Sequence, residues 1–497
     1  MSLLTTEEYK AIAASLTLPT QAFIDGSFRP AISGKTFTTT NPATGEVLAK
    51  IAACGPEDVD FAVAKARDAF EDGRWSRLHP KERKEVLIKL SKLIKRNARE
   101  LAVMESLDSG KTIYDCETVD VPETVHCLSW HAELIDKIYD QVAPSSDGHL
   151  ALVVREPVGV VGLVLPWNFP LLMLAWKISP ALAAGCSIVV KPAKETSLTA
   201  LRIAELAMEA GVPAGVFNVL PGGGADVGEP IGRHMDIDMV SFTGSTETGR
   251  KFLTYASESN LKEVTLEMGG KNPAVVLDDA ENLDRVAAHI TNGAFWNMGE
   301  NCSASSRLIV QKGVKEELLK RILAHAREWP MGDPLDPVNR VGALVSKSHY
   351  EKVASYITKD AKVLLGGKAA DGFVEPTILD CKPGDLQVRE EIFGPILTVL
   401  TVESYDEAIA LANDTEYGLA ASIYTANVKK AIRGARALRA GTVTVNSFGE
   451  GDIATPFGGY KQSGFGGRDN GIHAHDQYTQ IKTIWVDLSD DADEAVA

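Results

Sequence analysis

Cysteine is scarce in this chain, and its spacing excludes two structural roles. The 497 residues contain 6 cysteines, at positions 54, 116, 127, 186, 302 and 381. This spacing matches neither a disulfide framework nor a CxxC zinc motif. We therefore expect reduced thiols in a reducing compartment, and no metal centre.

Positive charge is also in deficit. The chain has 51 Lys and Arg residues against 67 Asp and Glu residues, which gives a formal net charge of −16 and a pI near 5.2. A protein of this charge is not attracted to phosphate backbones or to anionic lipid. The charge balance predicts that neither nucleic acid nor a membrane surface is a partner.

Targeting signals and membrane spans are missing as well. The N-terminus carries Glu7 and Glu8 and has no basic region before an apolar stretch, so we expect no signal or transit peptide. One long run without formal charge lies between Glu156 and Lys177. Two helix-breaking prolines in its middle divide it into a buried strand, a tight loop and a buried helix. The cytoplasm is therefore the predicted location.

Ordinary composition and a repeating pattern of elements predict an α/β protein of two or three domains. The chain is 45% hydrophobic and 24% charged, as in soluble globular proteins. From about residue 158, strand-like segments at 158–165, 187–190, 216–220 and 239–242 alternate with helix-like segments at 170–184, 197–210, 225–234 and 246–258. This alternation is typical of a parallel, doubly wound sheet, which binds ligands at the carboxyl ends of its strands.

A second α/β unit follows a strand at 263–266. Its expected strands lie at 274–277 and 307–310, and its helices at 283–297, 314–328 and 404–413. The region before residue 150 is helix-rich, with a long charged helix at 81–106 whose polar face we expect in solvent. The acidic end of the chain, residues 488–497, is predicted to be a frayed tail.

Two residues stand out as candidates for chemistry, although each has an ordinary alternative. Cys302 lies in the polar segment Gly299–Ser303, between a helix and a strand, where a thiolate can form; most single cysteines, however, are small buried apolar groups. Glu267 ends a strand and precedes the pair Gly269-Gly270, which equally suits a simple turn.

Two glycine-containing loops are candidates for binding phosphate. Residues 242–249 (FTGSTETG) follow a strand and open a helix, an arrangement that presents main-chain N–H groups to an anion. Residues 221–224 (PGGG) follow the preceding strand, although such turns are common without a ligand. The GxGxxG fingerprint follows no strand in this region, so a standard Rossmann assignment is weak.

Seven short motifs, in order, resemble those of the aldehyde dehydrogenase superfamily. They are PWNFP (166–170), KPA (191–193), FTGS (242–245), EMGGK (267–271), GENC (299–302), EEIFGP (390–395) and PFGGYK (456–461). The resemblance runs from about residue 20 to 486. It implies an aldehyde dehydrogenase-like α/β fold with two doubly wound domains: a cofactor-binding domain (1–134 and 151–265) and a catalytic domain (266–462). A small β domain (135–150 and 475–487) would join subunits into dimers or tetramers.

The resemblance also implies a mechanism and an NAD(P)-dependent activity. Cys302 would attack an aldehyde as the thiolate, because the neutral thiol is a poor nucleophile. The Asn168 side chain and the Cys302 main-chain N–H would hold the resulting oxyanion. After hydride transfer, Glu267 would act as general base for the water that hydrolyses the thioester.

Cofactor contacts are implied for a further set of residues. Similarity assigns Lys191 to the adenosine ribose, Trp167 and Ser245 to the pyrophosphate, Gly222 to the adenine side, and Glu391 and Phe393 to the nicotinamide ribose. Three more residues of the FTGS and EMGGK motifs are expected to contact the cofactor: Thr243, Gly244 and Gly269. NAD-preferring relatives commonly carry a glutamate three residues after the lysine that corresponds to Lys191, where this chain has Lys194. Since lysine has no acceptor and attracts phosphate, we predict NAD as the main cofactor with NADP also used.

The substrate pocket is expected to be aromatic with acidic groups at its mouth. Similarity places Phe169, Trp176, Trp296 and Phe457 in the tunnel, although any of them can equally be core. Asp120, Glu450 and Asp452 are the predicted acids, which suit an ammonium or guanidinium tail.

The motifs resemble most closely those of bacterial dehydrogenases of polyamine catabolism. The expected substrate is therefore an ω-amino or guanidino aldehyde, such as 4-guanidinobutyraldehyde, γ-glutamyl-γ-aminobutyraldehyde, 3-aminopropanal or 4-aminobutanal. Two alternatives stay open: a broad-range aliphatic or betaine-aldehyde dehydrogenase, and a non-catalytic homologue that keeps the fold.

Overall fold

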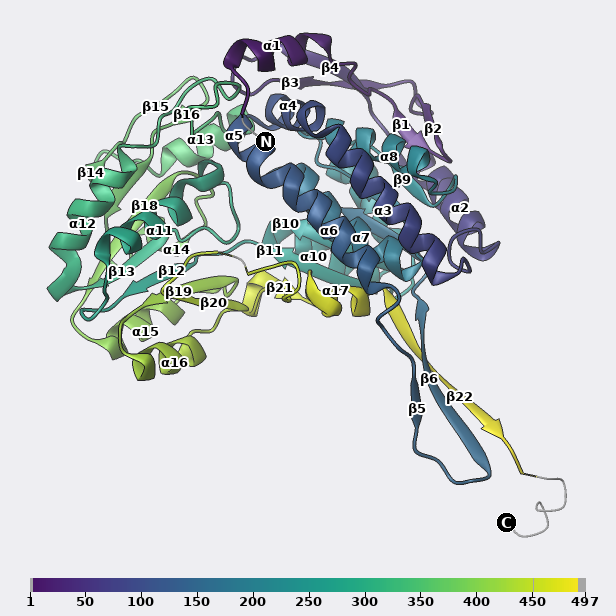
Figure 1. The fold of residues 1–497 in the computed structure, drawn as a ribbon. Helices are drawn as coiled ribbons and strands as arrows, with labels where there is room; N and C mark the ends of the chain where they lie inside the picture. The colour runs from purple at the N-terminus through teal and green to yellow at the C-terminus, as the bar shows by residue number, and fades with distance from the viewer. Residues whose placement is uncertain (1–2, 450, 490–497) are drawn as a thin grey trace.

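The computed structural model describes residues 3–449 and 451–489. Two α/β lobes lie side by side, and a long β-hairpin projects away from one of them (Figure 1). Most of the predicted acidic tail, from residue 490 on, lies outside the described residues, as does Glu450. Within the described ranges, no helix combines the length and apolar character needed to cross a membrane.

The first lobe is built on an eight-stranded sheet. Its order is β2-β1-β9-β8-β7-β10-β11-β21, and the five strands from β9 to β11 run parallel. From β7 the chain moves outward through β8 and β9, then returns to the other side of β7 for β10 and β11. Ligands bind at such a reversal of strand order, beyond the carboxyl ends of the strands. The strands are β1 (Ala22–Ile24), β2 (Ser27–Arg29), β7 (Val160–Val164), β8 (Ser187–Lys191), β9 (Phe217–Val219), β10 (Met239–Gly244), β11 (Glu263–Met268) and β21 (Gly464–Phe465).

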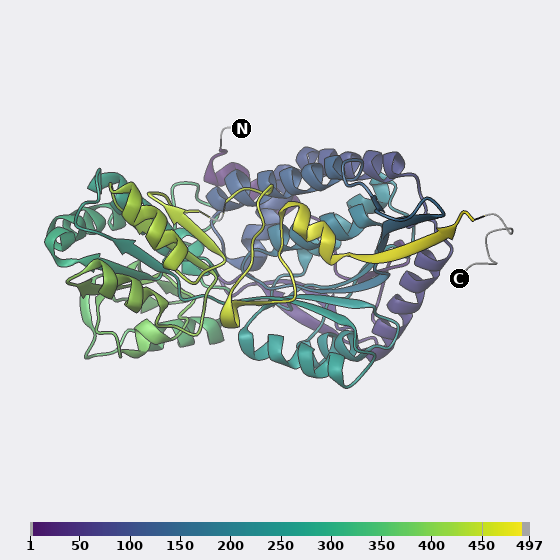
Figure 2. The same ribbon diagram turned by 90° about the horizontal axis from the view of Figure 1, so that it is seen from below.

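Helices cover both faces of this sheet, as the doubly wound prediction requires (Figure 2). Side chains alternate along a strand, so Val161 and Leu163 enter one core while Val160 and Val164 enter the other. The helices are α1 (Thr6–Ser15), α2 (Pro56–Glu71), α3 (Pro80–Arg96), α4 (Ala98–Ser109), α5 (Ile113–Asp115), α6 (Val121–Leu134), α7 (Pro170–Ala184), α8 (Leu198–Ala210), α9 (Glu229–Arg233), α10 (Thr246–Ser257) and α17 (Gly471–Gln477).

The prediction of a single helix at 81–106 is wrong in one respect. The structure has two helices, α3 and α4, separated at Asn97, whose φ of −97° and ψ of 21° leave the helical region. Its side-chain Nδ2 donates to the Leu93 carbonyl at 2.8 Å, which competes with continued helical bonding. All residues of α4 from Leu101 to Ser109 are buried. The region before residue 150 also contains a hairpin of β3 (Thr36–Thr40) and β4 (Val47–Ala52).

The second lobe contains a seven-stranded sheet in the order β14-β17-β18-β13-β12-β19-β20. Its strands are β12 (Pro273–Val276), β13 (Arg307–Gln311), β14 (Lys362–Leu365), β17 (Thr377–Asp380), β18 (Ile396–Val402), β19 (Ala420–Tyr424) and β20 (Thr442–Val445). Its helices are α11 (Leu283–Phe295), α12 (Lys312–Ala326), α13 (Lys347–Ser355), α14 (Leu386–Arg389), α15 (Tyr405–Asn413) and α16 (Val428–Ala437), and a small hairpin pairs β15 (Ala369–Ala370) with β16 (Phe373–Val374). This lobe agrees with the predicted second α/β unit.

The chain then returns to the first lobe. Strand β21 pairs antiparallel with β11, with Gly464 opposite Glu267, and the yellow segment in Figure 2 crosses between the lobes. This return joins the end of the second lobe to the edge of the first sheet.

The projecting hairpin is a separate three-stranded sheet. Strand β6 (His149–Pro157) pairs with β5 (Gln141–Ala143) on one side and with β22 (Thr479–Asp487) on the other. The predicted boundary at residue 151 therefore falls inside β6. Much of β22 is exposed, because no second layer covers this sheet among the described residues.

Candidate active site

A cavity of about 270 Å³ lies where the carboxyl ends of β7, β10 and β11 face the loop before β13. Its lining brings together the three predicted catalytic residues, Asn168, Glu267 and Cys302. Most of the predicted cofactor residues line it as well: Trp167, Thr243, Gly244, Ser245, Gly269, Glu391 and Phe393. The cavity therefore occupies the position that the strand order of the first sheet predicts.

Asn168 lies in the loop that leads from β7 into α7. Its side chain is buried, and its Nδ2 donates to the Glu300 carbonyl at 3.0 Å. A primary amide carries two N–H groups, so a second one is left for an oxygen atom in the cavity.

Cys302 is the one cysteine of the six that lines this cavity. None of the six forms a disulfide. Burial raises the pKa of both Cys127 and Cys186 to about 12, which keeps those thiols protonated. The Cys302 carbonyl accepts a hydrogen bond of 2.8 Å from Asn272 Nδ2, so the nucleophile candidate sits on an anchored loop.

Glu267 is a buried acid on β11. Burial, with the neighbouring Asp469 carboxylate, raises its pKa well above the usual range, while Lys177 and Arg468 act in the opposite direction. Lys177 Nζ lies 3.2 Å from Asp469 and 2.9 Å from the Ser241 hydroxyl. The Glu267 Oε2 atom has no hydrogen-bond partner among the described residues. A carboxyl group whose pKa is raised in this way is a better proton acceptor when ionised, as a general base requires.

The N-terminus of α10 opens at the same cavity. Ser245 caps this helix by accepting a 3.3 Å hydrogen bond from the Thr248 N–H, and Gly244 and Ser245 both line the cavity. The N-terminus of a helix attracts phosphate through its N–H groups and its dipole.

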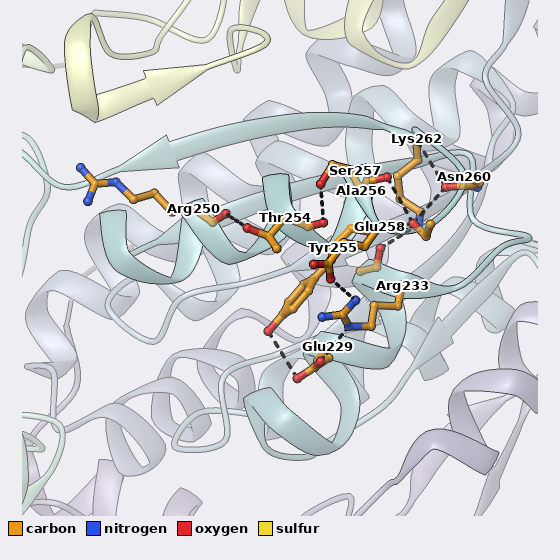
Figure 3. Close-up of polar contacts among 12 residues, drawn as sticks. Glu229, Arg233, Arg250, Thr254, Tyr255, Ala256, Ser257, Glu258, Asn260 and Lys262 are labelled. Atoms are coloured by element: carbon orange, nitrogen blue, oxygen red, sulfur yellow. Dashed lines mark hydrogen bonds and ion pairs between the residues drawn. The ribbon is translucent and has the colours of Figure 1, made fainter.

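Ion pairs hold the other end of α10 in place. Arg233 contacts Glu229 at 2.7 Å and Glu258 at 2.6 Å, and Lys262 Nζ donates to the Gly232 carbonyl at 2.7 Å (Figure 3). These contacts tie α9, α10 and the start of β11 together, which fixes the direction in which α10 points.

The residues at the expected nicotinamide end form a compact group. Glu391 Oε1 accepts a hydrogen bond of 2.7 Å from the Gly270 N–H, and a Cβ at Gly269 would collide with its carboxylate. Phe393 has a φ of 60°, and the Trp167 indole packs against its ring with centroids 5.3 Å apart. Carboxylate acceptors beside a helix N-terminus fit a dinucleotide, which carries both phosphates and ribose hydroxyls.

Two further residues of this group escaped the sequence reasoning. His349 and Lys352 of α13 line the cavity. His349 Nε2 lies 2.7 Å from the Phe393 carbonyl, and burial lowers the pKa of this histidine to about 4, so the neutral ring donates. No motif marks the segment 347–355, and only the packing of α13 against the loop at 391–395 brings it to the site.

Three predicted cofactor residues lie outside this cavity, along the same edge of the first sheet. Lys191 ends β8, donates to the Pro192 carbonyl at 2.9 Å, and has a pKa lowered to about 8 by burial. Gly222 follows β9, where a Cβ would collide with Val227. Lys194 is exposed, with its ammonium 5.4 Å from the centre of the Phe37 ring. An extended ligand that starts in the cavity would run past these positions.

A second cavity of about 470 Å³ adjoins the first, and Trp176 lines both. Of the residues predicted to contact the substrate, Trp296 and Asp452 line the second cavity, while Phe457 lines the first and packs on Trp176 with ring centroids 5.1 Å apart. Phe169 lines neither cavity; it is buried against Trp296, with ring centroids 5.3 Å apart.

The prediction that Asp120 lies at the mouth is wrong. Its side chain is fully buried, its carboxylate lies 2.5 Å from Lys111 Nζ, and it lines neither cavity. Asp120 is the last residue of a π-helical turn, Cys116–Asp120; Thr118 and Val119 of this turn line the second cavity, whereas Asp120 faces the buried Lys111.

Other charged residues line the second cavity instead: Asp115, Glu123 and Arg340. Burial raises the pKa of Asp115 to about 6. The Arg340 guanidinium lies 4.1 Å from the centre of the Tyr114 ring. The sequence shows acids at four positions between 115 and 123, and of these Asp115 and Glu123 line the cavity.

A thiol, an amide and a buried acid around one cavity, beside a dinucleotide-type sheet, are the groups expected of an oxidoreductase with a cysteine nucleophile. The chain belongs to the aldehyde dehydrogenase family, whose sequence profile matches residues 28–484.

Similar proteins cover almost the whole chain. The aminoacetaldehyde dehydrogenase of Pseudomonas aeruginosa is 66% identical over 493 residues, which is 98% of this chain and 99% of the relative. The NADP/NAD-dependent aldehyde dehydrogenase PuuC of Escherichia coli is 44% identical over 482 residues, covering 96% of this chain and 97% of the relative. The crystal structure of gamma-glutamyl-gamma-aminobutyraldehyde dehydrogenase from Burkholderia cenocepacia superposes with a TM-score of 0.96 at 48% identity, over 98% of this chain and 100% of that one. These matches confirm the fold and the predicted family.

Proposed function

We propose that this aldehyde dehydrogenase oxidises short ω-amino aldehydes to carboxylates through a thioester on Cys302, with NAD as its main cofactor. The observation that carries this proposal is a pair of cavities that share one wall, the Trp176 side chain. Cys302, Asn168 and Glu267 line the first cavity, and aromatic and acidic side chains line the second.

Side chains of this protein carry out both the attack on the aldehyde and the later hydrolysis of the thioester. The Cys302 thiolate forms a C–S bond to the carbonyl carbon, and the Asn168 amide donates to the oxygen that gains the negative charge. NAD, when bound, supplies the acceptor for the hydride that leaves this carbon. Glu267 then takes a proton from water as the water oxygen attacks the thioester. The C–S bond breaks, the thiolate leaves, and the product is a carboxylate.

The second cavity supports a cationic tail. Asp115, Glu123 and Asp452 provide negative charge there, and Trp176 and Trp296 provide aromatic faces. An ammonium group gains from both charge pairing and cation–π contact. The names of two similar proteins, which act on aminoacetaldehyde and on gamma-glutamyl-gamma-aminobutyraldehyde, agree with an aldehyde that carries an amino group.

A panel of aldehydes with neutral, ammonium, guanidinium and γ-glutamyl tails tests this proposal. We expect kcat/KM for 4-aminobutanal to exceed that for butanal by at least tenfold. Glu123→Gln combined with Asp452→Asn should reduce this ratio, whereas Glu133→Gln, an exposed acid outside the cavity lining, should leave it unchanged. Equal kcat/KM values for the two aldehydes in the wild-type enzyme would overturn the amino-aldehyde proposal.

A broad-range aliphatic aldehyde dehydrogenase is the second candidate. Arg340 lines the same cavity as the acids, and its positive charge offsets part of their attraction for an ammonium tail. The same panel separates the two candidates, because a broad-range enzyme would oxidise butanal and 4-aminobutanal at similar rates.

Use of NADP is proposed from the exposed Lys194. An ammonium at the adenosine end attracts a 2′-phosphate, and one relative is named as NADP/NAD-dependent. Lys194→Glu should lower kcat/KM for NADP more than for NAD. Absence of turnover with NADP in the wild-type enzyme would contradict this part of the proposal.

We also propose that the enzyme works in the cytoplasm as a homo-oligomer. The reduced cysteines support the compartment, and the uncovered sheet β5-β6-β22 supports contact with a second copy. Cell fractionation with an antibody tests the location; recovery with the membrane or secreted fraction would contradict it.

A further inference from the structure

The backbone before Cys302 has an unusual conformation. Asn297, Met298 and Gly299 have successive φ values of 53°, 55° and 66°. Residues with a side chain rarely adopt this left-handed region, and three in a row require support from the surrounding structure. All three are buried.

The Asn297 side chain connects the two loops that carry the nucleophile and the oxyanion donor. Its Nδ2 atom donates to the Asn168 carbonyl at 3.0 Å and to the Glu300 carbonyl at 2.9 Å. The Asn168 Nδ2 atom donates to the same Glu300 carbonyl at 3.0 Å. Both partners of Asn297 are carbonyl oxygens, so the donating atom must be its amide nitrogen.

These bonds link the two loops by both main chain and side chain. The Asn168 carbonyl is held by Asn297, and the Asn168 amide is held by the Glu300 carbonyl, two residues before Cys302. A shift of the Glu300 carbonyl would therefore turn the Asn168 amide relative to Cys302. Rates of this kind of chemistry are sensitive to displacements of about 1 Å.

We propose that Asn297 is a positioning residue, which sets the Asn168 amide relative to Cys302 without touching the substrate itself. This inference rests on the proposed role of Asn168 as the oxyanion donor. A purely structural role is the competing explanation, because a buried amide with two hydrogen bonds also stabilises the fold.

Asn297→Gly is the most informative variant. Glycine adopts a φ of 53° without strain, so the backbone keeps its path while the bridging amide is lost. We expect kcat to fall about 10- to 100-fold with KM changed less than about threefold, since one oxyanion donor is worth about 10²–10³ in kcat.

A double-mutant cycle distinguishes positioning from stability. If Asn297 acts through Asn168, then Asn297→Gly in an Asn168→Ala background should lower kcat by less than about threefold further. Asn218→Ala is the matched control, because buried Asn218 also donates from Nδ2 to two carbonyls, those of Ile188 and Gly215. We expect this control to lower the unfolding temperature and leave kcat unchanged.

The possible outcomes separate the two proposals. Wild-type kcat in Asn297→Gly, or an equal loss with and without Asn168, would overturn the positioning role while the oxidation of aldehydes stands. Wild-type kcat in Asn168→Ala would overturn it as well. A wild-type protein that reduces no NAD with any aldehyde would instead remove the proposed function.

Discussion

At the scale of single residues, opposing charges around Glu267 determine how readily it loses its proton. Burial and the Asp469 carboxylate raise the pKa of Glu267, while Lys177 and Arg468 lower it. Lys177 and Asp469 form a buried ion pair of 3.2 Å beside the site. The two members of this pair therefore influence the general base in opposite directions.

This arrangement predicts opposite pH shifts in two variants. A general base acts in its deprotonated form, so kcat should rise with pH through the pKa of Glu267. Asp469→Asn removes a negative charge, lowers this pKa, and should shift the acid limb of the kcat profile to lower pH. Lys177→Met removes a positive charge and should shift the limb to higher pH. Profiles of kcat against pH with a saturating aldehyde measure both effects.

A surface acid nearby serves as the control for these shifts. Asp476 of α17 lies seven residues from Asp469 and is partly exposed, so solvent screens its charge. Asp476→Asn should leave the acid limb in place. Shifts of the same direction in Asp469→Asn and Lys177→Met would show that the acid limb of the kcat profile does not reflect the ionisation of Glu267.

Individual site residues differed in how far the sequence could predict them. Cys302, Glu267 and Asn168 each lie in a short motif next to a strand or helix end, and the structure brings them to one cavity. His349 has no such motif, and its place depends on the packing of α13 against a loop more than 40 residues away. Asp120 was misplaced because its position was taken from the family resemblance, whereas in this structure its carboxylate pairs with the buried Lys111.

At the scale of elements, the buried helix α4 aligns two helices of the first lobe. Glu105 Oε1 accepts a hydrogen bond of 2.9 Å from the Leu171 N–H at the start of α7. Asp108 Oδ2 accepts one of 3.0 Å from the Leu198 N–H at the start of α8. Because these acids lie one turn apart on α4, a single helix sets the starts of two others, including the one that follows Asn168.

Removal of the Glu105 carboxyl group should therefore destabilise the enzyme. Glu105→Ala leaves the buried Leu171 N–H without an acceptor and should lower the free energy of unfolding by about 1–3 kcal/mol. Burial, with the Asp120 carboxylate, raises the pKa of Glu105 to about 8, so the group is largely neutral at pH 7. Glu105→Gln should therefore cost much less. Unfolding in urea at pH 7 measures both variants.

An exposed acid on the same helix provides the comparison. Glu100 pairs with Arg202 at 2.7 Å near the surface, and such pairs contribute about 0–1 kcal/mol. Glu100→Ala should therefore lower the free energy of unfolding less than Glu105→Ala does. Equal losses in Glu105→Ala and Glu105→Gln would indicate that the ionised carboxylate, rather than the hydrogen-bond acceptor, is what stabilises α7.

Element boundaries were predicted well where apolar periodicity ends at a strong signal. Helix α7 covers the expected residues 170–184, since Pro170 occupies its first turn and Gly185 ends it in the left-handed conformation. The expected helix at 81–106 failed because Asn97 interrupts a continuous amphipathic pattern. The burial of α4 follows from its position beneath other helices, which only the tertiary structure reveals.

At the scale of the whole molecule, the projecting three-stranded sheet β5-β6-β22 has an open edge at β22. Strand β22 pairs with β6 along one edge, and no other strand pairs with it within residues 3–449 and 451–489. An unpaired strand edge invites association with another chain. Ile481 and Trp485 are 68% and 63% exposed on this strand, which adds apolar surface to the open edge.

Charged substitutions on this strand should reduce the size of the assembly. We expect wild-type enzyme to elute above the monomer mass, because association would bury Ile481, Trp485 and the open edge of β22. Ile481→Lys with Trp485→Lys should shift the mass toward the monomer in light scattering after gel filtration. Val428→Lys on α16 is the control, because it replaces an apolar side chain that is 70% exposed. This variant should leave the mass unchanged. A monomeric wild-type enzyme, or an unchanged mass in the hairpin variant, would show that this sheet does not join subunits.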